Sequence, residues 1–447
     1  MRVAVIGAGV VGVTTAYELA ADGHEVVVFE RRGSVAVESS FAQAGLASPG
    51  AVGPWTGPGS AGRLLRTLMD RRSPWRVGAS AGAWGWMWRW WRAGKPATHR
   101  ANQLRMQRLA AYSRDRLHGL AASLKLDYER SDGHLVLLRT RKELDQVQPA
   151  LGLLTEQGIR FDTLDAAGCL AVEPGLSTET PLHAGIHLPA DEVGNCRQFA
   201  LLLRAAAEQM GAEFRFHSTV QSLEPGRRPR LTVMHSPHEE TTSRIASHGD
   251  TPNTPAFQPT MPLDGPVDET FDAVVVCAAL GANALLAPHG LKLPMAAVYG
   301  QSVTTPIRHH EAHPDIGPKS AVTDHRHRVV INRLGSRLRV SGGARMGPPH
   351  KGGQADELAR LYQVLDDWFP GAARVSQAQR WSGARPMLPD GPPVLGGSGI
   401  AGVWLNLGHG GAGWAMACGS ARLVADALAA RAPEVEIDGL GIERLAR

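Results

Sequence analysis

Residues 2–30 constrain the fold more than any other part of the chain. The segment RVAVIGA at 2–8 has the pattern of a short buried strand, and HEVVVFE at 24–30 repeats that pattern. Between them, apolar side chains recur on one helical face and a glycine stands where helices commonly end: Val13, Ala16, Tyr17, Ala20 and Gly23. A strand, a helix and a second strand in this order predict a parallel sheet covered by helices.

The turn before this helix carries Gly7-x-Gly9-x-x-Gly12, and the second strand ends at Glu30. The first glycine permits a tight turn, the second a close approach to a pyrophosphate, and the third close packing of helix on strand. A carboxylate at Glu30 suits ribose hydroxyls and disfavours a 2′-phosphate, although Arg31 and Arg32 weaken that objection. The alternative is a glycine-rich turn without a ligand. The predicted cofactor-binding residues here are Gly7, Gly9, Val10, Val11, Gly12, Glu30 and Arg31.

Length and composition narrow the class of protein. With 447 residues, 43% of them hydrophobic and 20% charged, the chain predicts two or three globular units and excludes a disordered chain, a collagen and a coiled coil. No uncharged apolar run reaches ~18 residues, and the N-terminus lacks a secretory pattern. The four cysteines form no CxxC pair, so we expect neither a disulfide nor a structural zinc. We expect a cytoplasmic protein.

Positive charge is concentrated between Arg63 and Arg114. That window holds twelve Lys or Arg and one acid, a net +11, whereas the whole chain carries +5. Five tryptophans within eight residues lie inside it, with Trp84, Trp88 and Trp91 on one helical face and Trp86 and Trp90 on another. Tryptophan beside cations suits a membrane interface, so segment 63–114 is a candidate for peripheral contact with the inner face of the cytoplasmic membrane. A core helix is the equal alternative, and no known motif supports nucleic-acid binding.

Further elements follow from periodicity and from turn residues. Segment 224–270 is proline-rich and has the composition of a disordered or excursion loop. His309, His310 and His313 have metal-like spacing, but a solvated loop is the favoured interpretation, and we predict no metal site. We expect helices at 79–95, 100–124, 197–210, 354–369 and from the glycine-rich turn to about 430, and strands at 133–139, 184–188 (ending at Pro189), 212–217, 219–223, 271–277, 296–305, 327–333, 337–343 and 403–407.

Two later motifs are candidate ligand-binding segments. Arg385 lies in Gly-Ala-Arg-Pro-Met, a rigid context of small residues from which a guanidinium can fork onto a carboxylate. The alternative role for Arg385 is a structural ion pair. The segment GHGGAGW at 408–414 joins an apolar strand to the terminal helix.

The chain resembles the small-subunit-type D-amino acid dehydrogenases, within the FAD-dependent D-amino acid oxidase and glycine oxidase group. The resemblance covers nearly the whole chain outside 224–270. The stretches that carry it, in family order, are VIGAGVVGVTTAYELAADGHEV, SSFAQAGLASPG, PWTGPG, AAYSRDRL, LPADEVGNC, INRLGSRLRVSGGA, WSGARPMLPDGPPVLG and VWLNLGHGGAGWAMACGSA.

The resemblance implies an α/β fold, in which a Rossmann-like FAD-binding domain is interleaved with an antiparallel-sheet substrate domain. We expect the FAD-binding domain to comprise 1–50, 165–290 and 380–447, and the substrate domain 51–164 and 291–379. It further implies FAD contacts from Ser39, Ser40, Ala44, Gly45, Val220, Gly281, Gly408, Gly410 and Gly413.

Three residues are the predicted catalytic group: Arg385, Tyr299 and His409. By resemblance Arg385 binds the substrate carboxylate, assisted by Tyr299 and Gln301. His409 neighbours the flavin ring, or else is a turn histidine bonded to backbone. Where the family pattern resembles Lys-Gly-Tyr, this chain has Tyr299-Gly300-Gln301, which leaves the role of the tyrosine open.

The predicted function is FAD-dependent oxidative deamination of D-amino acids to 2-oxo acids and ammonia, with hydride transfer from the α-carbon to flavin N5. Electrons would pass to a quinone or another acceptor. The alternatives are a glycine- or sarcosine-type enzyme, a D-proline or D-hydroxyproline enzyme, and a flavin-bearing interaction subunit without turnover of its own. Side-chain preference, electron acceptor and oligomeric state stay open.

Overall fold

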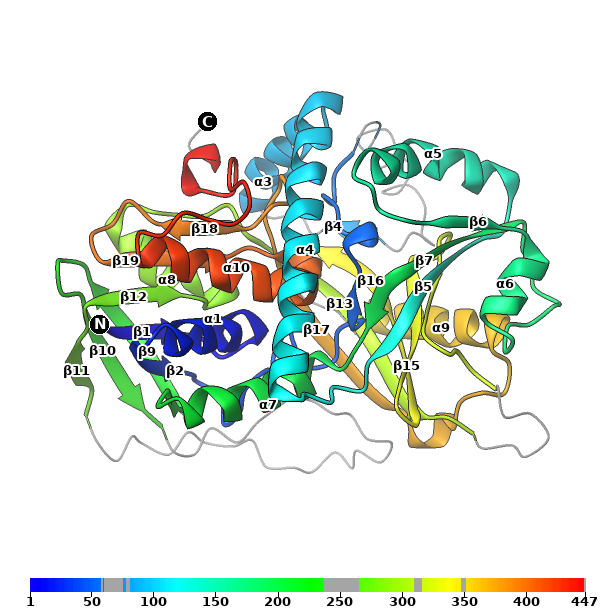
Figure 1. Cartoon of the computed structure of the whole chain (residues 1–447). Helices are drawn as coiled ribbons and strands as arrows, with labels where there is room; N and C mark the ends of the chain where they lie inside the picture. The colour runs from blue at the N-terminus through cyan, green and yellow to red at the C-terminus, as the bar shows by residue number, and fades with distance from the viewer. Residues whose placement is uncertain are drawn as a thin grey trace.

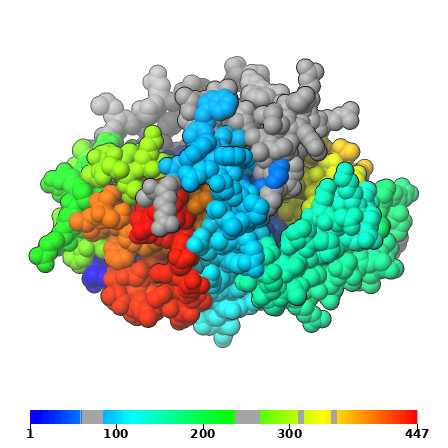
Figure 2. All heavy atoms as spheres, turned by 90° about the horizontal axis from the view of Figure 1, so that it is seen from above, coloured from blue at the N-terminus to red at the C-terminus, as the bar shows by residue number. Residues whose placement is uncertain are grey.

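Two sheets on either side of a long helix organise the molecule. The computed structural model describes residues 1–57, 59, 75–77, 81–236, 265–308, 316–346 and 351–445. Helix α4 (Pro96–Leu124) runs between the sheets in the side view and in the view from above (Figures 1 and 2). The fold is the α/β class expected, with one mostly parallel and one mostly antiparallel sheet.

The first sheet contains the predicted βαβ opening. Its order is β18-β19-β12-β1-β2-β8, and every neighbouring pair is parallel except β18 with β19. Alternate residues of β1 enter different cores: Val3 and Val5 on one face, Ala4 and Ile6 on the other. Strands buried on both faces read as unbroken apolar runs, which is why they were recognisable. The strands are β1 (Arg2–Ile6), β2 (Glu25–Phe29), β8 (Glu213–Arg215), β12 (Ala273–Val276), β18 (Val394–Gly397) and β19 (Val403–Leu407).

Helices cover one face of this sheet and a small antiparallel sheet contributes to the core on the other. The first face holds α1 (Val10–Ala21), α7 (Cys196–Gln209), α10 (Gly413–Leu428) and part of α4. The opposite core holds α8 (Ala282–Leu286) and side chains of β9 (Ser218–Glu224) and β10 (Arg230–His235); β10 also pairs with β11 (Val267–Thr270).

The loop prediction for 224–270 is therefore partly wrong. Strands β10 and β11 lie inside that segment, and Leu231 and Val233 are buried in the core beneath the first sheet. Their alternation is short, and the surrounding prolines obscured it. Residues 237–264 of the segment lie outside the described residues.

The second sheet is larger and carries α9 (Lys351–Trp368) on one face. Its order is β17-β13-β16-β15-β14-β5-β7-β3, with β4 added beside β16 and β6 beside β7. The core under α9 is built from branched residues of the central strands and from Trp368, which is fully buried. The strands are β3 (Leu46–Ala47), β4 (Trp75–Val77), β5 (Ser131–Leu138), β6 (Asp162–Leu164), β7 (Ala184–Val193), β13 (Ala296–Pro306), β14 (Ala321–Asp324), β15 (Val329–Leu334), β16 (Arg337–Met346) and β17 (Gln379–Met387); helices α5 (Arg141–Glu156) and α6 (Ala166–Val172) flank them.

One strand end differs from the expectation. Strand β7 does not stop at Pro189 but continues to Val193. Its pairing with β5 is irregular between Asp132 and His134, next to the proline. A proline lacks the N–H that a regular ladder needs, and such an irregularity accommodates it.

The sheets divide the chain differently from the expected domain boundaries. Segments 184–193 and 379–387 belong to the second sheet, although we assigned 165–290 and 380–447 to the FAD-binding domain. Helix α4, assigned to 51–164 of the substrate domain, packs on α1 and α10 of the first sheet. The two-domain division therefore stays a proposal, with its boundaries moved to follow the sheets.

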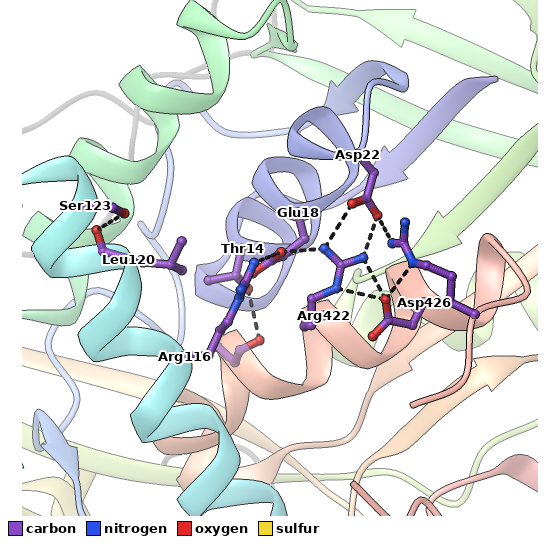
Figure 3. A network of polar contacts seen from close by, with 10 residues as sticks. Thr14, Glu18, Asp22, Arg116, Leu120, Ser123, Arg422 and Asp426 are labelled. Carbon is purple, nitrogen blue, oxygen red and sulfur yellow. Dashed lines mark hydrogen bonds and ion pairs between the residues drawn. The ribbon is translucent and has the colours of Figure 1, made fainter. Parts of the chain in front are cut away.

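A buried ionic network joins the helices over the first sheet (Figure 3). Glu18 of α1 is fully buried and accepts two hydrogen bonds of 2.7 Å from Arg116 of α4 and one of 2.9 Å from Arg422 of α10. Arg422 also binds Asp22 and Asp426, which the more exposed Arg431 contacts as well. Three helices far apart in sequence are thereby held in one arrangement.

The tryptophans of helix α3 (Ala81–Ala93) are buried on one face of the helix and exposed on the other. Trp86 and Trp90 are buried against Val298 and Met346 of the second sheet. The opposite face is exposed, with Trp84 at 76%, Trp88 at 53% and Trp91 at 54%. The core interpretation therefore holds for Trp86 and Trp90, and membrane contact by the exposed face stays a prediction. Residues 63–74 and 78–80 of the basic window lie outside the described residues.

None of the helices described is both long and apolar enough to cross a bilayer.

Candidate functional site

A cavity of about 880 Å³ lies where the two sheets meet. Its walls come from the residues that follow β1, β2, β12 and β19, and from strands β13 and β17 of the second sheet. The carboxyl ends of parallel strands meet at one edge of a sheet, which is where ligands of open α/β sheets bind. The cavity therefore joins the predicted nucleotide turn to the predicted flavin and substrate motifs.

The glycine turn at the start of α1 is tight for steric reasons. Gly7 has φ +102°, and a Cβ there would lie 2.9 Å from the carbonyl oxygen of Cys277. A Cβ on Gly12 would lie 1.8 Å from the carbonyl oxygen of Gly7, so only glycine lets α1 pack this closely on β1. Gly9 meets only the Ser40 hydroxyl oxygen, at 3.6 Å, and borders the cavity. The backbone can therefore approach a ligand at Gly9.

Glu30 closes the same end of the cavity. One carboxylate oxygen accepts a hydrogen bond of 2.7 Å from the amide of Ala8, and the other one of 2.8 Å from the amide of Arg32. Burial raises the pKa of Glu30, while these two amide bonds act in the opposite direction. Arg31 pairs with Glu38 at 2.6 Å and also borders the cavity. The carboxylate is held in place beside the phosphate turn.

Most predicted cofactor residues line this cavity, and three predicted residues do not. Gly12 serves the packing of α1, Gly45 packs against Gly194, and Tyr299 lies elsewhere on β13. Ser40 accepts a hydrogen bond of 3.1 Å from the amide of Val10, which fixes the 39–45 loop to the start of α1. The predicted residues that line the cavity are Gly7, Gly9, Val10, Val11, Glu30, Arg31, Ser39, Ser40, Ala44, Val220, Gly281, Gln301, Arg385, Gly408, His409, Gly410 and Gly413.

The glycine-rich turn before α10 holds a neutral histidine. His409 is buried, and its Nε2 lies 3.0 Å from the hydroxyl of Ser420. That hydroxyl donates to the carbonyl of Ala417, so Nε2 is the donor to it and Nδ1 is left as an acceptor. Burial lowers the pKa of His409 to about 3. The ring is uncharged at neutral pH and is bonded to a side chain rather than to backbone.

Arg385 reaches from β17 to the edge of the cavity. Its Nη1 donates to the carbonyl of Gly343 at 2.9 Å, and its aliphatic part passes Gly411 of the glycine-rich turn. Burial lowers the pKa of its guanidinium. No carboxylate among the described residues forms an ion pair with it, and the neighbouring Glu357 is held by Arg345 and Gln301 instead. A half-buried guanidinium with spare donors suits an external carboxylate.

The other two predicted substrate residues are placed differently. Val298 and Gln301 border the cavity on either side of Tyr299, but Tyr299 itself does not line it. Gln301 borders the cavity, but its Nε2 donates to Glu357 at 2.9 Å. The structure therefore brings Arg385 to the cavity with hydrogen-bond donors available. Gln301 also reaches the cavity, but its amide is already engaged, and Tyr299 does not line the cavity.

A chain of buried polar groups at the rim was not singled out from the sequence. Ser48, which borders the cavity, contacts Asp191 and also lies 3.3 Å from Nδ1 of His134; Nε2 of His134 is 2.7 Å from Thr323. Burial raises the pKa of Asp191 to about 6 and lowers that of His134 to about 4. Asp191 lies in the LPADEV stretch, but without the fold nothing links it to Ser48.

No group of three or more His, Cys, Asp or Glu residues in the described ranges is arranged to hold a metal ion. His309, His310 and His313 lie outside those ranges. The four cysteines are buried and unpaired.

Comparisons with known proteins cover nearly the whole chain. The family model described as FAD dependent oxidoreductase (DAO) matches residues 2–427. A D-amino acid dehydrogenase of Cereibacter sphaeroides is 40% identical, over 100% of this chain and 96% of that protein. A D-amino acid dehydrogenase of Rhodopseudomonas palustris is 36% identical, over 99% and 98%. The structure of glycine oxidase from Geobacillus kaustophilus matches with a TM-score of 0.69 at 20% identity, over 99% and 98% of the two chains.

Proposed function

The chain belongs to the DAO family of FAD-dependent oxidoreductases, and on that premise we propose that it oxidises D-amino acids to 2-oxo acids and ammonia and passes the electrons to a separate acceptor. The observation that carries the substrate assignment is Arg385, a half-buried cation at the cavity with no ion-pair partner among the described residues. A compact anionic group such as the carboxylate of an amino acid can accept hydrogen bonds from the donors of Arg385 that are left over.

The residues present fit FAD. Gly7 and Gly9 offer backbone to the cavity at the start of α1, whose first turn carries no acidic side chain, and Glu30 is positioned for ribose hydroxyls. The 408–413 turn and the start of α10 would hold the other end of the cofactor. Bound FAD supplies the two-electron oxidant for the reaction.

Substrate positioning falls to this chain. Arg385 would bind the carboxylate through two parallel N–H donors, which fixes both the position and the orientation of the α-carbon. His409 stays neutral, so it offers hydrogen-bonding capacity rather than a proton at neutral pH. In this arrangement precise placement, rather than a strong protein base, provides much of the rate.

An anaerobic titration of the yellow holoenzyme with paired D- and L-amino acids tests the proposal. We expect bleaching of the flavin band by D-enantiomers alone. Arg385→Ala should keep FAD and raise KM about 100-fold or more, because two charge-assisted hydrogen bonds are lost. Arg380→Ala, on the same strand but away from the cavity, is the matched control. Bleaching by L-enantiomers, or unchanged kinetics in Arg385→Ala, would refute the assignment.

We further propose that the electron acceptor is a quinone at a membrane surface. The exposed face of α3 supports it, because Trp84, Trp88 and Trp91 stand beside Arg92, whose guanidinium lies 4.8 Å from the Trp88 ring centroid. Co-sedimentation with vesicles rich in phosphatidylglycerol should retain the wild type and lose a Trp84→Ser/Trp88→Ser/Trp91→Ser variant. Equal retention of both would remove the membrane part and leave the oxidation itself unaffected.

A further inference from the structure

Two glycines face each other across neighbouring strands at the edge of the cavity. Gly300 of β13 pairs with Gly383 of β17. Each is covered by a longer side chain from β17. A Cβ on Gly300 would lie 2.3 Å from Nη2 of Arg385, and one on Gly383 would lie 2.0 Å from Cη2 of Trp381. The bare backbone is what allows a guanidinium and an indole to lie flat at this point.

The two covering side chains are therefore neighbours. Residues 381, 383 and 385 alternate along β17 and share one face, and Trp381, Gly383 and Arg385 all border the cavity. Because Gly300 and Gly383 pair across β13 and β17, the guanidinium over one and the indole over the other occupy adjacent positions on one face of the sheet. A carboxylate held by Arg385 places the rest of its molecule next to Trp381.

The surface that Trp381 presents is apolar. The atoms nearest Gly383 are Cη2, Cζ2 and Cζ3, which belong to the six-membered ring and carry no polar group. The neighbouring cavity residues Val298, Met387 and Trp55 are apolar as well. Glu357, whose charge acts on Arg385, is engaged by Arg345 and Gln301.

We propose that Trp381 is the residue that determines substrate side-chain specificity, as an apolar wall beside the carboxylate site that favours uncharged side chains and limits their bulk. This inference rests on the proposed function, since it takes the carboxylate of a D-amino acid as the group that Arg385 holds. Gly383 is required for this apolar wall, because any side chain at position 383 displaces the Trp381 indole. Gly300 has the matching role for the guanidinium.

The two glycines allow the roles to be separated. Gly383→Ala should move Trp381 and change selectivity, whereas Gly300→Ala should move Arg385 and weaken binding of every substrate. Gly397→Ala on β18 is the matched control, because a Cβ there meets nothing within 4 Å. Each variant is compared as holoenzyme with its FAD content measured, so that loss of fold is seen separately.

The experiment measures kcat/KM for D-alanine and D-phenylalanine, by anaerobic flavin reduction and in steady state. Trp381→Ala and Gly383→Ala should shift the D-phenylalanine to D-alanine ratio about tenfold or more towards D-phenylalanine, and Trp381→Phe should stay near wild type. Gly300→Ala should lower both values together. A Trp381→Ala variant that changes both substrates by the same factor would overturn the inference.

Benzoate supplies a readout without turnover. It carries a carboxylate and an apolar ring but no oxidisable α-carbon, and its binding is followed by the visible spectrum of the bound flavin. Trp381→Ala should weaken it about tenfold, with no change in Gly397→Ala. If no D-amino acid bleaches the wild-type flavin, the proposed function fails. The benzoate titration then still decides on Trp381, and unchanged affinity in Trp381→Ala overturns its role.

Discussion

Replacing Arg422 by methionine should remove the centre of the network that joins α1, α4 and α10. Arg422 is 9% exposed and faces Glu18, Asp22 and Asp426, which lie at 2.9, 2.5 and 3.0 Å. Methionine has a similar length but no charge, so these carboxylates lose a shared cation. Breaking a buried ion pair by removing one partner costs about 3 to 5 kcal/mol. The free energy of unfolding should fall by about that amount.

Arg431 provides the matched control. It binds the same two aspartates, but its side chain is 45% exposed. Exposed pairs contribute about 0 to 1 kcal/mol each, so Arg431→Met should cost about 1 kcal/mol.

Urea denaturation of both variants, with FAD in excess, compares the two costs. The midpoint should fall by about 1 M for Arg422→Met and by much less for Arg431→Met, since unfolding free energy falls linearly with denaturant. Equal losses in the two variants would refute the argument that burial sets the cost.

Three further outcomes are expected. Gly12→Ala should prevent FAD retention, since its Cβ would lie 1.8 Å from the Gly7 carbonyl oxygen. In the control Gly119→Ala on α4, the new Cβ meets nothing within 4 Å, so the free energy of unfolding should rise by up to ~1 kcal/mol. FAD content and thermal unfolding check both variants, and a yellow Gly12→Ala protein would contradict the packing argument. Folding raises the pKa of Asp191 from 3.8 to about 6, so its contribution is present below pH ~4 and is lost as pH rises through 6, by up to about 3 kcal/mol. Asp191→Asn should therefore gain stability relative to wild type between pH 4 and 7, and a difference that is constant with pH would contradict this. His409→Asn should leave the pH dependence of turnover between pH 5 and 8 unchanged, because the histidine stays neutral there; loss of a titration in that range on substitution would contradict its low pKa.

Local features were the ones that the sequence could predict. The glycine turn, α1 and the buried strands β1, β2 and β12 each depend on residues within about ten positions of one another, so spacing was enough to find them. The strands were also buried on both faces, which leaves an unbroken apolar run in the sequence. Arg385 was found because its rigid context and its resemblance to relatives agree.

Features that depend on distant packing could not be predicted. Periodicity separated the two faces of α3, but which face is buried depends on Val298 and Met346, more than 200 residues away. The pairing of Gly300 with Gly383 depends likewise on the register of two strands 83 positions apart. Tyr299 was expected at the substrate site because its neighbours in the sequence belong there, yet it does not line the cavity that Val298 and Gln301 border.

The order of strands in the first sheet has a consequence for how the protein is made. Strand β1 pairs with β12, and β12 with β19, so the sheet needs residues 2, 276 and 407 together. The glycine turn at 408–413 completes the cavity and is made about 400 residues after the first glycine turn. At about 5 to 20 residues per second, the ribosome needs roughly 20 to 80 seconds to extend from the first glycine turn to the second. During that time the early βαβ unit has an unpaired edge and a cofactor site with one wall missing. Complete enclosure of FAD therefore has to wait until the 408–413 turn has been made.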